Sequence, residues 1–337
     1  MSNRNKRLDL ARGLIMIYIV TIVHGVYWLG FGQAFTSILL FEMPLVFIIS
    51  GYAYAIYAKT NPSINLRIYI KYAQTRMSRI YIPYFAYALV CAIVVTMLQG
   101  NINIQENLFA WLNPFTRGQG HSVSSLSWHL WFIPPFLIVT LLLPVVTYKW
   151  IKKLPLVLCF LLLCFFLYFA NWYIEARLAT PVFYFFWAYV GFKLGGGLTL
   201  KSNTLLIVIA IAISMLGIGV VFLNQSLNMQ LNKFPPNLMF LWFSCIWVAI
   251  IFMACNYISP NVINYLSENK FVSLFVKNGY SLYLWQGVGY ASAKAMQSQF
   301  DLNVVITWLI AIMFTVILGM LFSPLEKIRW SFSRTRK

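Results

Sequence analysis

Ten long hydrophobic segments dominate this sequence and constrain its fold more than any motif does. A run of about 20 apolar residues can cross the hydrocarbon core of a bilayer as a helix. Lipid offers the backbone no hydrogen-bond partners, so only helices or closed barrels can cross it. We therefore predict an all-α, polytopic membrane helix bundle of about ten transmembrane helices, forming a single domain over residues 1–337. The expected spans lie near residues 13–33, 36–58, 81–99, 128–148, 154–172, 180–197, 203–223, 238–258, 278–297 and 302–322.

The composition indicates the same class of protein. Apolar residues make up 61% of the chain, charged residues make up 9%, and the mean hydropathy is +0.76. Soluble domains carry about 25% charged residues. The first apolar segment is too long for a signal-peptide core and lacks a small-residue cleavage site, so we expect it to remain as a helix. The five cysteines lie inside apolar segments without metal-ligand spacing, so we expect packing thiols and no bound metal.

The net charge of +18 invites a nucleic-acid interpretation, but its distribution indicates membrane topology instead. With ten spans, alternate connections collect nearly all of the 25 Lys and Arg residues. The other side receives only Arg117, Arg177, Lys233 and Lys294. The positive-inside rule places the cation-rich side, with both termini, in the cytoplasm. We therefore expect membrane lipids, and no nucleic acid, among the partners.

A lone histidine, His24, lies inside the first apolar segment, twelve residues after Arg12. That spacing is about 18 Å of helix, which places His24 near the bilayer midplane if Arg12 lies at its surface. An ionisable side chain there is costly unless it is used, and an imidazole can exchange a proton with a substrate near neutral pH. The pattern favours a catalytic His24, while a histidine bonded to another helix only for packing is the alternative.

Two arginines, Arg76 and Arg79, stand three residues apart just before the third apolar segment. On a helix they share one face at the predicted cytoplasmic boundary. Guanidinium groups can each make paired hydrogen bonds to phosphate oxygens, so the pair suits a nucleotide-like cofactor. The alternative is an interfacial cluster that anchors the segment to anionic lipid.

Polar and aromatic residues near the membrane boundaries give further candidates. Glu42 lies inside the second apolar segment, where its cost predicts a charged partner, and His24 is the nearest by depth. Trp128, His129 and Trp131 lie together at the start of the fourth segment. Their rings suit a sugar in an acceptor site, although an interfacial aromatic belt explains the two indoles equally well.

The order of these elements resembles the acyltransferase 3 family of integral membrane O-acyltransferases. The matching pieces are RLDLARG with the histidine span, FEMPLVFIISGY, RMSR before Ile-Tyr-Ile-Pro, WHLWFIP and GYSLYLWQ. They run in the family's order from residue 7 to about residue 286, so the resemblance covers most of the chain. The resemblance rests on the order of these pieces more than on any single one. The polar groups of the last piece are Ser281, Tyr283 and Gln286, which either bond across helices or line a cavity.

The resemblance implies an O-acetyltransferase of surface glycans, located in the plasma membrane, the cytoplasmic membrane of a bacterium. An acyl group, usually acetyl, would pass from cytoplasmic acyl-CoA, a donor substrate rather than a resident cofactor, to a hydroxyl of a cell-surface or lipid-linked glycan. By position, Arg12 and His24 match the first-helix pair tied to catalysis, and Arg76 and Arg79 match the pair linked to donor binding. Glu42 would orient the imidazole, as a carboxylate does in hydrolase triads. The last piece departs from the family, with Gln286 where a histidine is frequent.

Two other classes of protein remain open at this point. A proton-coupled secondary transporter would also place His and Glu at mid-depth, but it does not need paired arginines at one mouth and often shows inverted repeats. We see no convincing internal repeat. A structural membrane protein would not need a buried histidine. Assembly of several copies of the chain is compatible with each of these classes.

Overall fold

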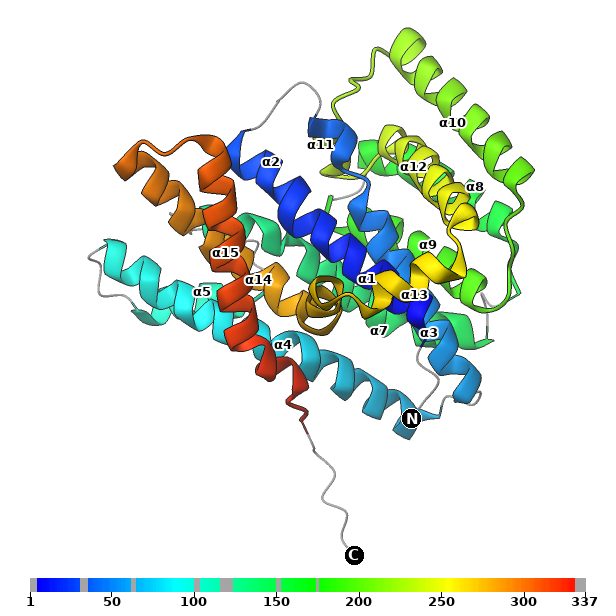
Figure 1. Ribbon diagram of the computed structural model, residues 1–337. Coiled ribbons are helices and arrows are strands. Elements are labelled where there is room, and N and C mark those ends of the chain that lie inside the picture. The colour runs from blue at the N-terminus through cyan, green and yellow to red at the C-terminus, as the bar shows by residue number, and fades with distance from the viewer. Residues whose placement is uncertain are drawn as a thin grey trace, which may run out of the picture. The chain divides into compact units, whose positions relative to one another are not determined.

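Figure 1 shows the computed structural model of the protein, which describes residues 5–30, 36–61, 65–99, 104–115, 124–149, 153–173 and 176–330. Every named element in those ranges is a helix, which confirms the all-α prediction. The chain forms two compact units. Unit 1 comprises residues 1–15, 32–64 and 138–272, and unit 2 comprises residues 16–31, 65–137 and 273–337. The single-domain assignment stays a prediction.

Unit 1 is built on the close packing of α3 and α9. Gly51 of α3 faces the backbone of Ala188, and Gly191 of α9 faces the backbone of Ile48, so closely that a Cβ at either glycine would overlap the facing carbonyl. Small residues let membrane helices approach in this way. The elements of this unit are the first part of α1 (Lys6–Ile17), η2 (Thr36–Leu39), α3 (Glu42–Thr60), most of α7 (Ile133–Lys149), α8 (Leu156–Tyr173), α9 (Ala176–Gly195), α10 (Ser202–Leu223), α11 (Met229–Lys233), α12 (Leu238–Tyr257) and α13 (Pro260–Glu268).

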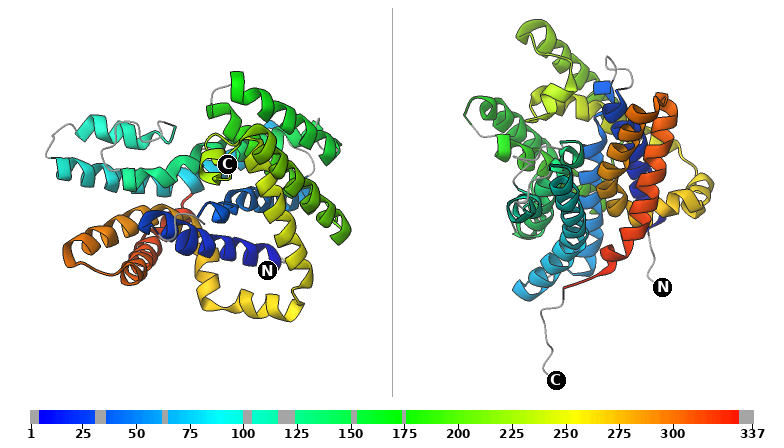
Figure 2. Two further views of the ribbon diagram at one scale, coloured as in Figure 1. Left: turned by 90° about the horizontal axis from the view of Figure 1, so that it is seen from above. Right: turned by 90° about the vertical axis from the view of Figure 1, so that its left-hand side faces the viewer.

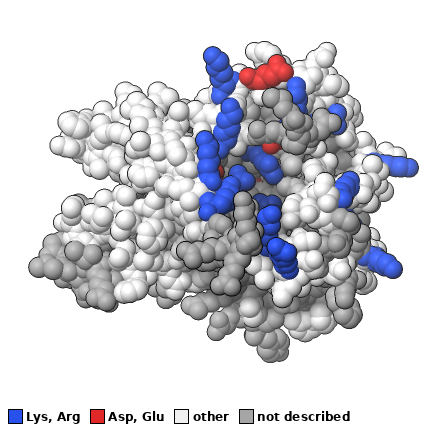
Figure 3. Space-filling model, turned by 90° about the horizontal axis from the view of Figure 1, so that it is seen from below, with Lys and Arg blue, Asp and Glu red and all other residues white. Residues whose placement is uncertain are grey.

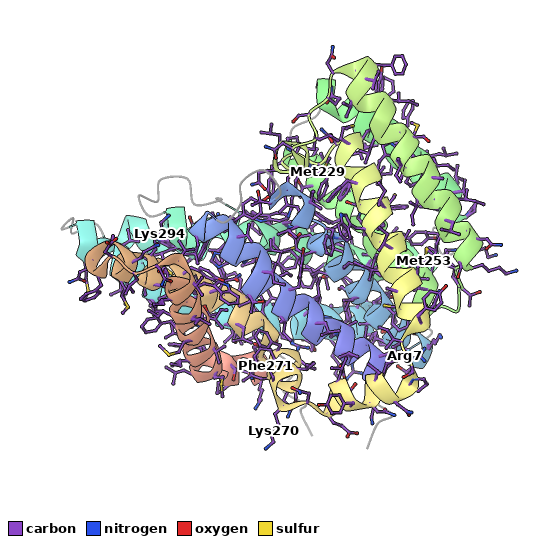
Figure 4. The ribbon with its side chains drawn as sticks, turned by 45° about the horizontal axis from the view of Figure 1, so that its top comes forward. Arg7, Met229, Met253, Lys270, Phe271 and Lys294 are labelled. Carbon is purple, nitrogen blue, oxygen red and sulfur yellow. The ribbon has the colours of Figure 1, made fainter. Side chains whose placement is uncertain are left out.

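Two of these helices are set by local capping. Asn237 begins α12 by accepting a hydrogen bond from the backbone N–H of Phe240, and α10 packs beside α12 (Figure 1). Helix α12 runs from α11, where Met229 lies, to α13, whose junction with α14 carries Lys270 and Phe271 (Figure 4). Helix α13 begins at Pro260 after the cap residue Ser259 and turns away from the direction of α12 (Figure 2). These short polar signals fix where the apolar helices start.

Unit 2 has its core between α4, α5 and α14. Trp111 of α5 and Tyr87 of α4 are fully buried there with Trp285 of α14, and α5 packs along α4 (Figure 2). The hydroxyl of Tyr84 donates to the carbonyl of Trp111 at 2.5 Å. The elements of this unit are η1 (Tyr18–Val23), α2 (His24–Leu29), α4 (Leu66–Gln99), α5 (Ile104–Leu112), α6 (Ser124–Ser127), η3 (Trp128–Phe132), most of α14 (Lys270–Phe300), α15 (Val304–Phe322) and η4 (Ser323–Lys327).

The described helices agree with most of the expected spans, with differences at their ends. Helix α4 begins at Leu66, so residues 66–80, which precede the third expected span, belong to the same helix as that span. Residues 104–112, expected in a connection, form α5, whose apolar face packs on α4. Residues 31–33 of the first expected span lie outside the described residues. The number of spans and the sidedness of the termini stay predictions.

Seven helical stretches among the described residues are long and apolar enough to cross a membrane. They are Lys6–Leu29, Thr36–Thr60, Leu66–Met97, Trp128–Tyr148, Ser202–Leu223, Leu238–Tyr257 and Val304–Lys327.

Candidate active site

A π-helical segment, η1, directly precedes His24. Where an α-helix widens to a π-turn, its backbone hydrogen bonds are shifted by one residue, and such turns are frequent at functional sites. Two side chains from other helices bind the carbonyls of this segment. The hydroxyl of Tyr290 on α14 donates to the carbonyl of Val20 at 2.9 Å, and the indole N–H of Trp308 on α15 donates to that of Thr21 at 2.7 Å. These bonds fix the rotation at which α2 begins, and therefore the direction of His24.

The imidazole of His24 is buried in an aromatic cluster of unit 2. It is 3% exposed. Its ring centre lies 5.1 Å from that of Trp128, 6.1 Å from Tyr283 and 6.3 Å from Trp28. The structure therefore brings the predicted catalytic histidine next to the predicted acceptor-binding tryptophan, over a hundred residues away in sequence. We call the set His24, Trp28, Trp128, His129 and Tyr283 the histidine cluster.

His129 is the second imidazole of this cluster and is completely buried. Its ring centre lies 6.4 Å from that of His24. The Nε2 atom lies 3.1 Å from the carbonyl oxygen of Leu284, and the hydroxyl of Tyr283 donates to the backbone carbonyl of His129. Because a carbonyl can only accept, Nε2 carries the proton and Nδ1 is left as an acceptor. Nδ1 is buried without a hydrogen-bond partner among the described residues.

Two members of the WHLWFIP piece have different surroundings. Trp128 lies 5.4 Å from Trp28, ring centre to ring centre, as well as against His24. Trp131 is half-buried and contacts Phe132 at 6.4 Å. Trp28 is not among the residues predicted from the sequence, although its position four residues after His24 puts both rings on one face of α2. That spacing was the available signal.

Glu42 has a different partner from the one suggested by depth in the membrane. Its carboxylate binds the ammonium of Lys233 at 2.5 Å, and the two side chains are 2% and 3% exposed. The prediction that Glu42 has a charged partner is confirmed, but the partner is Lys233 and not the expected His24. Lys233 ends the short helix α11, which the sequence analysis treated only as an external cation. A catalytic role for Glu42 stays a prediction.

Arg12 lies on α1, in the part of that helix that belongs to unit 1. Its guanidinium lies 3.5 Å from the carboxylate of Asp9, one turn earlier, and both remain partly accessible. The pair is of the i, i+3 kind that stabilises helices only weakly. The predicted catalytic role of Arg12 stays a prediction.

The paired arginines of α4 belong to a larger charged group in unit 2. Arg79 is exposed and experiences the charges of Arg76, Arg329 and Glu326, while the guanidinium of Arg76 lies 5.3 Å from the ring centre of Tyr72. Arg329 follows η4 and is bound to the carbonyl of Glu326 at 2.5 Å. We call Arg76, Arg79 and Arg329 the arginine group. Arg329 could not be predicted as a member of this group, because 250 residues separate it from Arg79 and no local pattern links them.

Glu326 ties this group to α14. Its buried carboxylate accepts a hydrogen bond from the backbone N–H of Ser281 at 2.7 Å. Asn278, three residues earlier, has non-helical backbone angles, so α14 bends there. The carboxylate thus satisfies a backbone donor beside the bend. Figure 3 shows a face of the molecule on which Lys and Arg side chains gather with few acidic ones. The arginine group is suited to bind phosphate oxygens.

The described residues hold no group of three or more His, Cys, Asp or Glu side chains placed to bind a metal ion. The histidine cluster offers an imidazole that can exchange a proton, flat aromatic faces and hydrogen-bonding atoms. A buried histidine in such surroundings can act as a general base or as a nucleophile.

Comparison with known proteins identifies the family. The acyltransferase domain family matches residues 5–324, nearly the whole chain. No curated protein and no solved structure matched the chain. The match supports a multi-pass membrane enzyme and gives no support to a proton-coupled transporter. The chain belongs to the acyltransferase 3 family and is a membrane acyltransferase.

Proposed function

We propose that this acyltransferase moves an acyl group, acetyl in the usual case, from cytoplasmic acyl-CoA to a hydroxyl of a cell-surface or lipid-linked glycan. The observation that carries the proposal is the position of two sites along one helix. Ser281 of α14 binds the carboxylate that acts on the arginine group, and Tyr283 packs against His24. Helix α14 therefore contacts both the arginine group and the histidine cluster. A donor whose phosphates bind at the first site could reach the second through its long pantetheine arm.

In this mechanism the arginine group binds the phosphates of coenzyme A. Arg76 and Arg79 supply paired N–H donors, and Arg329 adds a third positive charge. Charge-assisted hydrogen bonds of this kind are about twice as strong as neutral ones. The flexible pantetheine arm then carries the thioester toward the histidine cluster.

His24 acts as the general base. It removes the proton from the acceptor hydroxyl while the oxygen attacks the thioester carbonyl. The resulting tetrahedral intermediate releases the coenzyme A thiolate, which takes the proton back from the imidazolium. A positioned base of this kind contributes roughly 10²–10⁴-fold in rate. A covalent acyl-histidine intermediate is the other route by which the same residue could transfer the group.

The acceptor binds among the rings around His24. Trp28 and Trp128 offer aromatic faces next to the imidazole, and His129 offers Nδ1 as an acceptor. Sugars combine apolar ring faces with hydroxyl donors, so the cluster matches both of their surfaces. Trp131, three residues after Trp128, extends the predicted acceptor site. An acceptor exposed on or assembled at the cytoplasmic membrane of a bacterium would have access to such a site.

Transfer of label tests this proposal directly. Membranes containing the protein are incubated with acetyl-CoA labelled in the acetyl group, and glycans are extracted and treated with mild base, which releases O-linked acetate. We expect base-labile label in glycan from these membranes and none from membranes without the protein. Label that enters lipid or protein but no glycan would refute the proposed acceptor. Label supplied equally well by a donor lacking the nucleotide would refute the role of the arginine group.

A further inference from the structure

Gln286 of α14 is a polar side chain that the fold does not use. It is 0% exposed, and neither its amide nitrogen nor its amide oxygen has a hydrogen-bond partner among the described residues. The great majority of buried polar groups in proteins are hydrogen-bonded, so each exception needs an explanation. A bound molecule that supplies the missing partners is one such explanation.

The position of Gln286 on α14 places it beside the histidine cluster. Tyr283, three residues before it, packs against His24, and Tyr290, four residues after it, lies 4.7 Å from Trp28, ring centre to ring centre. Residues three and four apart share one side of a helix. The next residue, Gly287, lacks a Cβ that would lie 2.6 Å from the imidazole of His129. Gln286 is therefore flanked along the helix by residues that contact the cluster.

Other polar atoms of the cluster share this property. The indole nitrogens of Trp28 and Trp128 and the Nδ1 atom of His129 are buried without a hydrogen-bond partner among the described residues. Two of these atoms are donors and one is an acceptor. Together with the amide of Gln286 on the neighbouring stretch of α14, these are hydrogen-bonding atoms that an apolar ligand would leave unsatisfied.

We propose that Gln286 binds the acyl acceptor through a hydroxyl pair next to the hydroxyl that is acylated. This inference rests on the proposed function. A thioester carbonyl would use only the amide N–H and leave the amide oxygen without a donor. Neighbouring hydroxyl groups, as on a sugar ring, donate to the oxygen and accept from the nitrogen at once. Gln286 is therefore a specificity-determining residue for polyhydroxyl acceptors.

The test combines stability with transfer in two substitutions. Gln286→Leu replaces the amide by an apolar group of similar size, and Gln297→Leu is the matched control, a partly exposed glutamine on the same helix. We measure labelled acetyl transfer to endogenous glycan, the apparent KM for acetyl-CoA and the thermal unfolding temperature. We expect Gln286→Leu to lower transfer about tenfold to a hundredfold, with an unchanged KM for acetyl-CoA and an unfolding temperature no lower than that of the wild type.

A simpler pair of acceptors tests the hydroxyl-pair chemistry. The wild-type protein should acylate octane-1,2-diol faster than octan-1-ol, and Gln286→Leu should remove that preference while Gln297→Leu keeps it. Equal wild-type rates on the two probes would overturn the hydroxyl-pair role.

Each other outcome is also decisive. A Gln286→Leu protein that unfolds at a lower temperature, with transfer reduced only in proportion to the folded fraction, would show that the amide is structural and overturn the inference. Unchanged transfer in this variant would overturn it too. Wild-type membranes that transfer label to no glycan would instead overturn the proposed function, and the inference with it.

Discussion

The buried ion pair between Glu42 and Lys233 gives the most quantitative prediction for stability. Both side chains are almost fully buried, and the second carboxylate oxygen of Glu42 has no hydrogen-bond partner among the described residues. Lys233→Met would leave a buried carboxylate uncompensated, and Glu42→Gln would leave a buried ammonium. Removing one partner of such a pair costs about 3–5 kcal/mol, whereas removing both charges costs much less. We therefore expect each single variant to be strongly destabilised and the double variant to recover most of the loss.

A thiol-labelling assay can measure this cycle in detergent. Cys245 on α12 is buried in the same unit as the pair, so a variant keeping only this cysteine reacts with a fluorogenic maleimide when unit 1 unfolds. We expect each single substitution to lower the apparent Tm by at least about 5 °C. Because buried pairs are poorly screened, the loss should persist at high salt. Single variants as stable as the parent, or a double variant whose loss is the sum of the two, would show that the two charges do not compensate each other in the folded protein.

Three further predictions concern the arginine group, the π-helix and the helix pair of unit 1. Arg79→Ala should raise the apparent KM for acyl-CoA about tenfold to a hundredfold without loss of folded protein. An unchanged KM would indicate instead that Arg76 and Arg79 anchor the helix to anionic lipid. Tyr290→Phe and Trp308→Phe each remove a donor to η1, so transfer should fall while the KM for acyl-CoA stays constant; normal transfer in both would show that these bonds do not orient His24. Gly51→Leu should lower the unfolding temperature sharply, because its side chain would overlap the backbone of α9. Gly217→Leu on α10 should be tolerated, because a Cβ there meets nothing within 4 Å. Equal effects of the two substitutions would show that close packing at Gly51 does not stabilise unit 1.

The helical architecture could be predicted from the sequence because each crossing needs a long, uninterrupted apolar run. The start of α4 could not be placed this way. Residues 66–80 are polar enough to resemble a loop, yet they continue the helix. Helix α5 was missed for the opposite reason, since its nine residues are too few to span a bilayer and its apolar face is used against α4. Length and hydropathy predict helices that cross a membrane, but they do not predict helices that are too short or too polar to cross one.

The individual residues of the candidate site were visible in the sequence, but their combination was not. His24 was selected as an ionisable residue inside an apolar segment and Trp128 as a ring that suits a sugar, and only the fold shows that their rings are 5.1 Å apart. Lys233 looked like a surface cation because nothing in its local sequence indicates the distant Glu42. The π-turn before His24 depends on donors from α14 and α15, so its register is a tertiary property.

His24 is the residue to which we assign the chemistry of acyl transfer, and the His24→Gln variant removes that chemistry with little change in size. Glutamine can replace hydrogen bonds of the imidazole but cannot accept a proton at neutral pH. Initial rates of labelled acetyl transfer should be measured for this variant over a range of acetyl-CoA concentrations. We expect a fall in kcat of at least about a hundredfold, the lower end of what a positioned base supplies, with an unchanged KM and normal insertion. Near-normal transfer by this variant would show that His24 is not the base, and His129 would be the next candidate.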